Sequence, residues 1–198
     1  MSTVLMELTD EQLISSCRGE GPERAKALVG ELARRHVERV ASFIYGLTGD
    51  PTGSLDLAQE AFVRVFKHRE NYKEIARFST WLYTIARNLA LNEIRNRRHR
   101  PSLVQGAGDS DEGDALGRLA GTEETPADEV ERGDLRAIVR REINELPEHY
   151  RVVVILCDLE ERPYAEAAEI LEVPVGTIRS RLSRAREQLE QRLRRSLS

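Results

Sequence analysis

Apolar residues recur at intervals of three and four through much of the N-terminal half, which is the period of an α-helix. One segment carries them at i, i+3, i+4, i+7 and i+8, at Ala58, Ala61, Phe62, Val65 and Phe66. A second segment repeats the pattern through Phe78, Trp81, Leu82, Ile85 and Leu89. Two further helices are expected at residues 13–17 and 27–47, because glycine and proline interrupt the pattern after each. The pattern predicts a helical bundle.

The C-terminal part has the same helical period in shorter segments. Its first helix carries apolar residues at Leu135, Ile138, Val139, Ile143 and Leu146. Pro147 ends this helix, and a second is expected over residues 148–159. Two more follow at residues 164–171 and 175 to about 195, with only three residues between them. Two helices joined by so tight a turn predict a helix-turn-helix.

Residues 101–127 lack this pattern. They contain few large apolar side chains and several helix breakers: Gly106, Gly108, Gly113, Gly117, Gly121 and Pro126. Such a segment cannot bury enough apolar surface to offset the entropy lost on ordering, so it is interpreted as a flexible linker. We therefore expect an all-α protein with two small helical domains, at residues 1–100 and 128–198, joined by a flexible acidic linker that proteases cut first.

Charge is unevenly distributed, although the net charge of the chain is only −4. Residues 67–100 hold nine basic and three acidic side chains, and residues 175–198 hold seven basic and two acidic ones. Residues 101–134 hold ten acidic and two basic side chains. Two basic surfaces flank an acidic spacer, which indicates two separate contacts with nucleic acid.

The last predicted helix is the strongest candidate for one of these contacts. Its apolar stripe comprises Val175, Ile178, Leu182, Ala185, Leu189 and Leu193. The opposite face then carries Arg179, Ser180, Ser183, Arg184 and Glu187, close to the N-terminal end where a recognition helix meets base edges. Arginine binds guanine in bidentate fashion, and serine contacts bases or phosphate. An ordinary solvated basic face is the alternative interpretation.

Other classes of function lack the residues that they require. Cys17 and Cys157 are the only cysteines and no histidines cluster, so we expect no disulfide, no metal and no cofactor. Residues 1–13 contain acidic side chains and no apolar run, so a cytoplasmic protein without membrane insertion is expected. A nuclease would need clustered carboxylates or histidines facing a pocket, which the pattern does not provide, and we expect no enzyme activity.

Two long motifs resemble one family. The sequences LPEHYRVV (146–153) and YAEAAEILEVPVGTIRSRLSRAR (164–186) resemble region four of the extracytoplasmic-function (ECF) sigma factors of bacterial RNA polymerase. The sequences DLAQEAF (56–62) and FSTWLYTIARN (78–88) resemble region two of the same family. Both occur in the family's order. The resemblance implies a sigma factor that binds core RNA polymerase, recognises the minus-35 and minus-10 promoter elements and promotes DNA melting.

The resemblance also implies site residues. Contact with the polymerase clamp is expected from Asp56, Gln59 and Glu60, although each fits a solvated polar face equally well. Contact with the minus-10 element is expected from Asn71, Tyr72, Phe78, Ser79, Arg87, Asn88, Asn92 and Arg95. Contact with the minus-35 element is expected from Tyr164, Gly176, Thr177, Arg179, Ser180, Ser183 and Arg184. Trp81 lies on the apolar stripe and is predicted to be a core residue. A requirement for a small residue, where the chain packs closely at the turn, is the alternative explanation for Gly176.

The partners implied by the resemblance are core RNA polymerase, promoter DNA and an anti-sigma factor. The acidic linker would thread the polymerase cleft, where its charge either mimics nucleic acid or serves solubility. Three residues depart from the family pattern, at Leu55, Ala167 and His36. Leu55 stands where an acidic residue often precedes the aspartate, and the other two are expected to alter packing. A free-standing helix-turn-helix regulator is the alternative, but it gives the motif at residues 56–62 no role.

Overall fold

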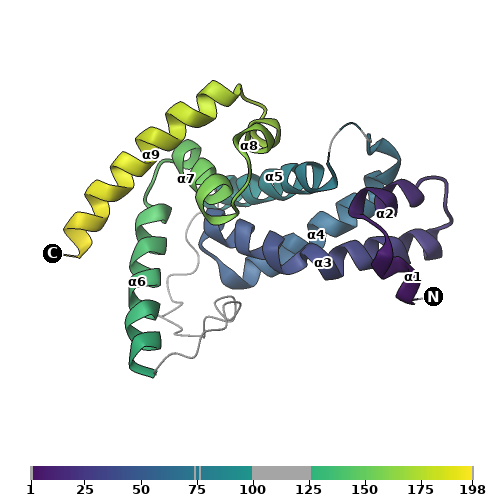
Figure 1. Cartoon of the computed structure of the whole chain (residues 1–198), viewed down its shortest axis with the longest axis horizontal. Helices are drawn as coiled ribbons and strands as arrows, with labels where there is room; N and C mark the ends of the chain where they lie inside the picture. The colour runs from purple at the N-terminus through teal and green to yellow at the C-terminus, as the bar shows by residue number, and fades with distance from the viewer. Residues whose placement is uncertain (1, 74, 76, 100–125, 198) are drawn as a thin grey trace.

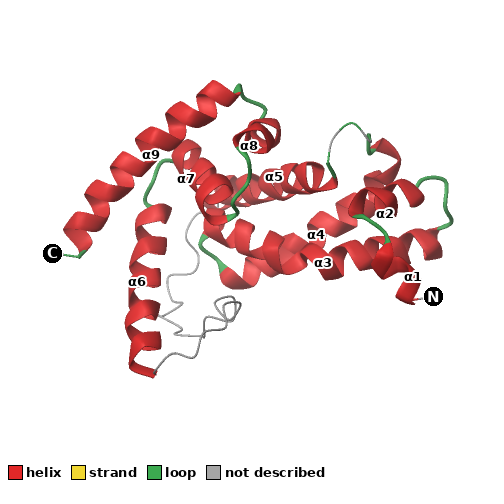
Figure 2. Cartoon of the chain, in the orientation of Figure 1, coloured by secondary structure: helices red, strands yellow, loops and turns green. Residues whose placement is uncertain are grey.

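The computed structural model describes residues 2–73, 75, 77–99 and 126–197, and all regular structure in these ranges is helical (Figures 1 and 2). The N-terminal bundle comprises α1 (Ser2–Glu7), α2 (Asp10–Ser16), α3 (Pro22–Thr48), α4 (Pro51–His68), the 3-10 turn η1 (Arg69–Asn71) and α5 (Phe78–His99). The C-terminal unit comprises α6 (Pro126–Asn144), α7 (Glu148–Val154), the π-helical turn η2 (Ile155–Leu159), α8 (Tyr164–Leu171) and α9 (Val175–Ser196). The all-α prediction is confirmed.

A tight reversal between α3 and α4 organises the N-terminal bundle. Gly49 ends α3 in the left-handed conformation (φ 69°), and its N–H donates to the Tyr45 carbonyl at 2.8 Å. Asp50 caps α4, because its Oδ1 accepts a hydrogen bond from the Gly53 N–H at 3.0 Å. Pro51 occupies the first helical position, where no N–H is needed. The two helices therefore lie side by side over most of their length (Figure 1).

The apolar faces predicted for α4 and α5 form the core of this bundle. In α4 the buried members are Ala58, Ala61, Phe62 and Val65, and Phe66 packs partly exposed against them. In α5 the buried members are Phe78, Leu82 and Leu89, while Trp81 and Ile85 are partly buried. The helical period thus identified the faces that pack together.

Arg35 of α3 holds the N-terminal helices in place. Its guanidinium donates to the carbonyls of Leu5 and Leu8, each at 2.8 Å, and to Asp10 Oδ1 at 3.0 Å. His36 Nε2 lies 2.6 Å from Asp10 Oδ2. His36 therefore has a polar partner in addition to the packing role expected from the sequence.

The C-terminal unit contains the predicted helix-turn-helix. α8 begins and ends at the predicted residues, and α9 extends one residue beyond the expected end. Glu172 turns the chain in the left-handed conformation (φ 54°), and the Val173 N–H donates to the Ala168 carbonyl at 3.0 Å. Pro174 then precedes α9. The helix predicted at residues 148–159 consists of α7 followed by the π-helical turn η2.

The first helix after the predicted linker begins earlier than expected. The apolar pattern starts at Leu135, but α6 begins at Pro126, two residues inside the predicted linker at residues 101–127. Proline suits the first turn of a helix, since its nitrogen needs no partner there. The rest of the predicted linker, residues 101–125, lies outside the described residues.

The N-terminal bundle and the C-terminal unit are in direct contact. α5 packs against α8, and the C-terminal end of α3 packs against α6, α7 and η2 (Figure 1). Gly46 lies at this contact, where an added Cβ would come within 3.1 Å of the Ile155 side chain, closer than an ordinary van der Waals contact. Arg151 Nη1 donates to the Leu47 carbonyl at 2.9 Å. Their buried apolar side chains form one continuous cluster, where the sequence favoured two separate cores.

Candidate nucleic-acid and polymerase interfaces

The start of α9 presents an exposed polar face. Ile178, Leu182 and Ala185 are buried, which fixes the rotation of the helix. The four α9 residues predicted to read bases are all exposed on the opposite side: Arg179, Ser180, Ser183 and Arg184. Leu189 and Leu193, predicted for the buried stripe, are only half buried. The buried contact of α9 is thus concentrated in its first half, beneath the predicted recognition face.

Ion pairs divide the arginines of α9 into two groups. Arg186 binds Asp158 of η2, with Nε 3.1 Å from Oδ2, and Arg194 Nη2 lies 2.6 Å from Glu190 Oε1. Within the described ranges, neither Arg179 nor Arg184 has a carboxylate within ion-pair distance. Their guanidinium groups are therefore available to an anionic or polar partner.

The turn before α9 is open to solvent. Gly176 is exposed, and beyond its chain neighbours and the backbone of its own helix a Cβ built there would meet no atom of the described residues within 4 Å. Close packing within the chain therefore does not explain this glycine. Thr177 is half buried, and its N–H donates to the Pro174 carbonyl at 2.8 Å. Tyr164, the first residue of α8, is 37% exposed. All three residues predicted near the phosphates lie at helix N-termini, where backbone N–H groups favour an anion.

A second polar strip follows the C-terminal half of α5. Asn88, Asn92 and Arg95 are exposed and spaced at i, i+4 and i+7, so they share one face. Arg95 Nη1 donates to Asn92 Oδ1 at 3.3 Å. Arg87 is half buried, and its Nε has no hydrogen-bond partner among the described residues. Asn71 is exposed on η1.

The aromatic residues predicted for the minus-10 element are buried in this structure. Tyr72 is 2% exposed and Phe78 is fully buried. Trp81 completes their cluster, with its ring centroid 5.4 Å from that of Tyr72 and 6.4 Å from that of Phe78. Trp81 thus packs against the core, as its place on the apolar stripe predicted. Ser79 is half buried and donates to Glu166 of α8.

Ile75 is a residue that the sequence reasoning missed. It lies between Asn71 and Phe78 and is 97% exposed, the most exposed large apolar side chain in the described ranges. The available signal was an isoleucine flanked by charged and small residues outside any helical pattern. Its exposure, between the buried Tyr72 and Phe78 in the sequence, makes it a candidate for apolar contact with a base.

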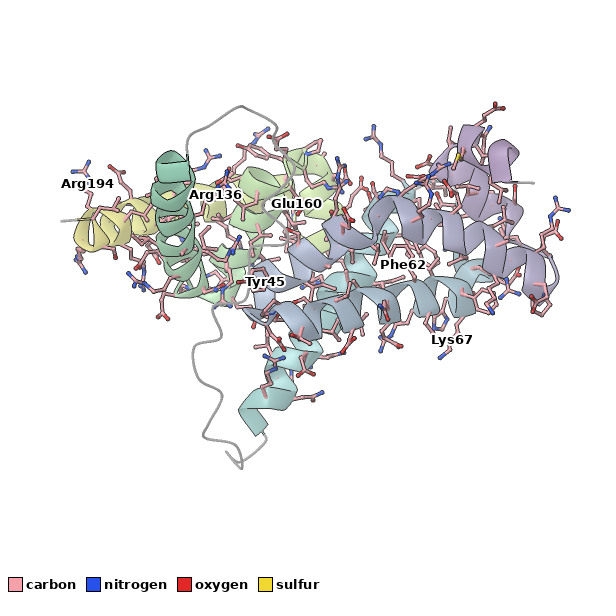
Figure 3. All side chains as sticks on the ribbon, turned by 90° about the horizontal axis from the view of Figure 1, so that it is seen from below. Tyr45, Phe62, Lys67, Arg136, Glu160 and Arg194 are labelled. Carbon is pink, nitrogen blue, oxygen red and sulfur yellow. The ribbon has the colours of Figure 1, made fainter. Side chains whose placement is uncertain are left out.

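The outward face of α4 combines acidic and apolar residues. Asp56 and Gln59 are exposed, and Glu60 pairs with Arg64 at 3.0 Å. Leu55 and Val63 are 48% and 42% exposed on the same helix. Beside them, a groove of about 580 Å³ runs between α3 and α4, lined mainly by apolar side chains including Phe62, which Figure 3 labels between the two helices.

In the described part of the chain, no group of three or more histidine, cysteine or acidic side chains is placed to hold a metal ion. None of the described helices combines the length and apolar character needed to cross a membrane.

Comparisons with known proteins identify the family. Residues 32–100 match the model of sigma-70 region 2, and residues 136–189 match that of sigma-70 region 4. The chain is 34% identical over 192 residues to the ECF RNA polymerase sigma-E factor of Escherichia coli K12, covering 94% of this chain and 95% of that one. It is 31% identical to SigW of Bacillus subtilis, covering 79% and 84%. The 35% match to SigE of Mycolicibacterium smegmatis covers 85% of this chain but 63% of that protein.

Solved structures confirm the fold. CnrH, in complex with the cytosolic domain of CnrY, superimposes with a TM-score of 0.65 at 20% identity, covering 93% of this chain and 96% of that one. The sigma factor RpoE of Bartonella quintana, in complex with the anti-sigma factor NepR, gives a TM-score of 0.57 at 20% identity, covering 87% and 96%. With both family models matched in order and relatives covered almost end to end, the chain belongs to the ECF family of RNA polymerase sigma factors.

Proposed function

We propose that this protein binds core RNA polymerase in the cytoplasm, directs it to promoters with a specific minus-35 and minus-10 sequence, and promotes DNA melting without catalysing a reaction itself. The observation that carries the proposal is the pair of exposed polar faces on α5 and α9, in a chain of the ECF family. Residues 1–100 would serve the clamp and minus-10 contacts, residues 128–198 the minus-35 contact, and residues 101–127 would connect them.

The minus-35 element would be read by α9. Arg179 and Arg184 are exposed and have no ion-pair partner in the described ranges, so base contact would not require breaking an existing pair. Ser180 and Ser183 lie on the same face. The open space around Gly176 supports close approach of a phosphate to the helix N-terminus.

The minus-10 element would contact α5 and the loop before it. Asn88, Asn92 and Arg95 form an exposed strip that suits a single strand or its phosphates. The buried Tyr72 and Phe78 would then anchor the two ends of the loop in the core, with the exposed Ile75 between them as an apolar contact. Extruding a base from the duplex costs a few kcal/mol, which such contacts must offset.

Core polymerase would dock on α4. The acidic and amide side chains of Asp56, Gln59 and Glu60 lie beside the exposed Leu55 and Val63. A partner with basic side chains along an apolar ridge would satisfy both features. Leu55, which departs from the family pattern, would add apolar area to this contact.

An anti-sigma factor is the proposed regulator. Both solved sigma-like structures described above were obtained in complexes, CnrH with the cytosolic domain of CnrY and RpoE with the anti-sigma factor NepR. The apolar groove between α3 and α4 and the half-buried leucines of α9 are surfaces that such a partner would cover.

Transcription with purified core polymerase tests the proposed function. A promoter library transcribed with and without this protein should yield products only with it, from templates sharing two short elements. Asp56→Ala, which removes a charge from α4 but no charge from α5 or α9, should reduce co-purification with core polymerase. Absence of both transcription and polymerase binding would refute the proposal. Hydrolysis of DNA by the chain with a metal ion and no polymerase would indicate an enzyme instead.

A further inference from the structure

The first residue of α5 is capped from a distant part of the chain. Arg77 occupies the N-cap position, because its carbonyl accepts the first helical hydrogen bond, from the Trp81 N–H at 3.3 Å. A guanidinium has donors but no acceptor, so the Arg77 side chain cannot satisfy the first N–H groups of the helix. Glu11 of α2 supplies the acceptor, since its Oε1 accepts a hydrogen bond from the Phe78 N–H at 3.2 Å. A carboxylate also suits this end of a helix, which carries partial positive charge.

α2 holds Glu11 in a fixed position. Leu13 and Ile14 anchor this helix, because both are fully buried in the core. A capping box closes its first turn, in which Thr9 and Gln12 exchange hydrogen bonds through their side chains. Figure 1 shows α2 at the end of the N-terminal bundle where α5 begins. The Glu11 carboxylate therefore reaches α5 from a helix that is itself fixed by packing.

The turn after α2 makes a second contact, with η1. The Gly19 N–H donates to Glu70 Oε1 at 3.2 Å. Asn71 and Tyr72, which follow Glu70 directly, are predicted to contact the minus-10 element, as is Phe78 at the start of α5. α2 and the turn after it are thus hydrogen-bonded to the chain on both sides of the segment predicted to contact this element.

A fixed start of α5 would favour recognition of the minus-10 element. A segment that is already ordered loses less conformational entropy when DNA binds, so less of the contact energy is offset by ordering. Extruding a base from the stack opposes binding and makes this saving important. The negative charge of Glu11 would by itself repel DNA phosphates. Its hydrogen bond to Phe78 gives a carboxylate a function at this place.

We propose that Glu11 is a positioning residue for minus-10 recognition, which fixes the start of α5 without touching DNA. The inference rests on the proposed function for its consequence, whereas the hydrogen bond to Phe78 is a property of the free chain. The match with sigma-70 region 2 begins at residue 32, so α2 lies outside the matched segment. Minus-10 recognition by region 2 would therefore depend on a helix that precedes it.

Amide hydrogen exchange of the full-length chain tests the hydrogen bond without DNA or polymerase. Glu11→Ala removes the acceptor, and the Phe78 N–H should then exchange about tenfold faster than in the wild type. Glu11→Gln keeps an acceptor oxygen and should retain much of the protection. Glu7→Ala is the matched control, because it removes an exposed charge from the neighbouring helix α1, and it should exchange like the wild type. Circular dichroism should show unchanged helix content in all three variants.

DNA binding by the complex with core polymerase tests the consequence. The first probe is a single-stranded minus-10 oligonucleotide, with its sequence taken from the promoter library. Glu11→Ala should weaken its binding about fivefold and reduce discrimination against substituted minus-10 sequences, and Glu11→Gln should restore much of both. The second probe is a duplex that carries only the minus-35 element, and its binding should not change. Loss of charge alone would instead make binding to every DNA slightly tighter, as expected for Glu7→Ala.

Several results would overturn the positioning role. An unchanged exchange rate of the Phe78 N–H in Glu11→Ala, or Glu11→Gln as impaired as Glu11→Ala, would show that the hydrogen bond is not responsible. Tighter DNA binding by Glu11→Ala, or equal weakening on both probes, would show that Glu11 does not act on minus-10 recognition. A wild-type complex that binds neither probe would refute the proposed function and with it this role, while the exchange rates would still report the hydrogen bond.

Discussion

Arg186 of α9 and Asp158 of η2 form a two-point ion pair, in which Nε and Nη2 of the guanidinium each donate to one carboxylate oxygen. These hydrogen bonds raise the pKa of Arg186. The pair ties the middle of α9 to the helix beneath it, two residues beyond the exposed Arg184. We therefore expect a structural role for a basic residue of α9 that already has an ion-pair partner in the chain, and a recognition role for one that has none.

Arg186→Ala should affect folding rather than base preference. The side chain is 55% exposed, so solvent screens the pair and its loss should cost at most about 1 kcal/mol of unfolding free energy. Chemical denaturation measures this cost, and Asp158→Ala should give a similar value. A changed order of preference among minus-35 sequences would show instead that Arg186 contacts bases.

Arg179→Ala and Arg184→Ala should affect base preference rather than folding. Each should cost roughly 1 to 3 kcal/mol at the cognate minus-35 element and relax base preference there, because a bidentate contact is lost. Arg194→Ala, a control on the same helix, should weaken binding uniformly and only slightly. Transcription from wild-type and minus-35-substituted promoters measures both effects. Equal loss on every sequence would mean that Arg179 and Arg184 act only as an electrostatic patch.

The substitution Gly176→Ala tests whether this glycine is needed for folding or for the close approach of a DNA phosphate. Beyond the chain neighbours and the backbone of the same helix, no atom of the described residues lies within 4 Å of the added Cβ. The unfolding free energy should therefore stay equal or rise by up to about 1 kcal/mol, as for glycine to alanine in a helix. Affinity for promoter DNA in the polymerase complex should fall on all sequences alike. Unchanged DNA affinity would place the phosphate elsewhere, and reduced stability would reveal a strained backbone at this residue.

Lowering the pH should reduce the stability of the N-terminal bundle, because Glu31 becomes protonated. Hydrogen bonds from Arg34 and Arg35 lower the pKa of this carboxyl to about 2, from an ordinary value of 4.5. A group whose pKa is lowered by folding stabilises the native state above its unfolded pKa, and the contribution disappears as pH falls toward the folded value. Glu31→Gln should therefore lower the melting temperature at pH 7, and the difference from wild type should shrink between pH 4.5 and pH 2. Glu38→Gln, which removes an exposed charge from the same helix, is the control at each pH.

Helix positions were predictable where an apolar stripe meets a clear stop. The bounds of α8 were predicted correctly because its apolar pattern stops before a turn that contains Pro174. The residue before a proline is disfavoured in helical conformation, so the helix ends before this turn. The start of α6 was missed because residues 126–134 are mostly acidic and small, and carry no stripe. Helix propensity without amphipathicity leaves no periodic signal.

The direction of side chains in the candidate site was only partly predictable. The exposed face of α9 followed from its period, since three buried residues fix the rotation. Tyr72 and Phe78 were proposed for DNA contact by family resemblance, which does not determine whether an aromatic side chain faces the core. The apolar stripe did indicate a buried Phe78, but Tyr72 lies outside it. The contact between Gly46 and Ile155 could not be foreseen, because periodicity identifies an apolar face but not the element that packs on it.

Fluorescence anisotropy of a labelled promoter duplex, with and without core RNA polymerase, tests promoter recognition through polymerase most directly. At physiological salt the chain alone should bind weakly and with little sequence preference, with a Kd of about 10⁻⁶ M or higher, as expected for charge attraction alone. With core polymerase the same duplex should bind with a Kd of about 10⁻⁸ M or lower, and substitutions in either promoter element should weaken it. Nanomolar, sequence-specific binding by the chain alone would contradict the requirement for polymerase.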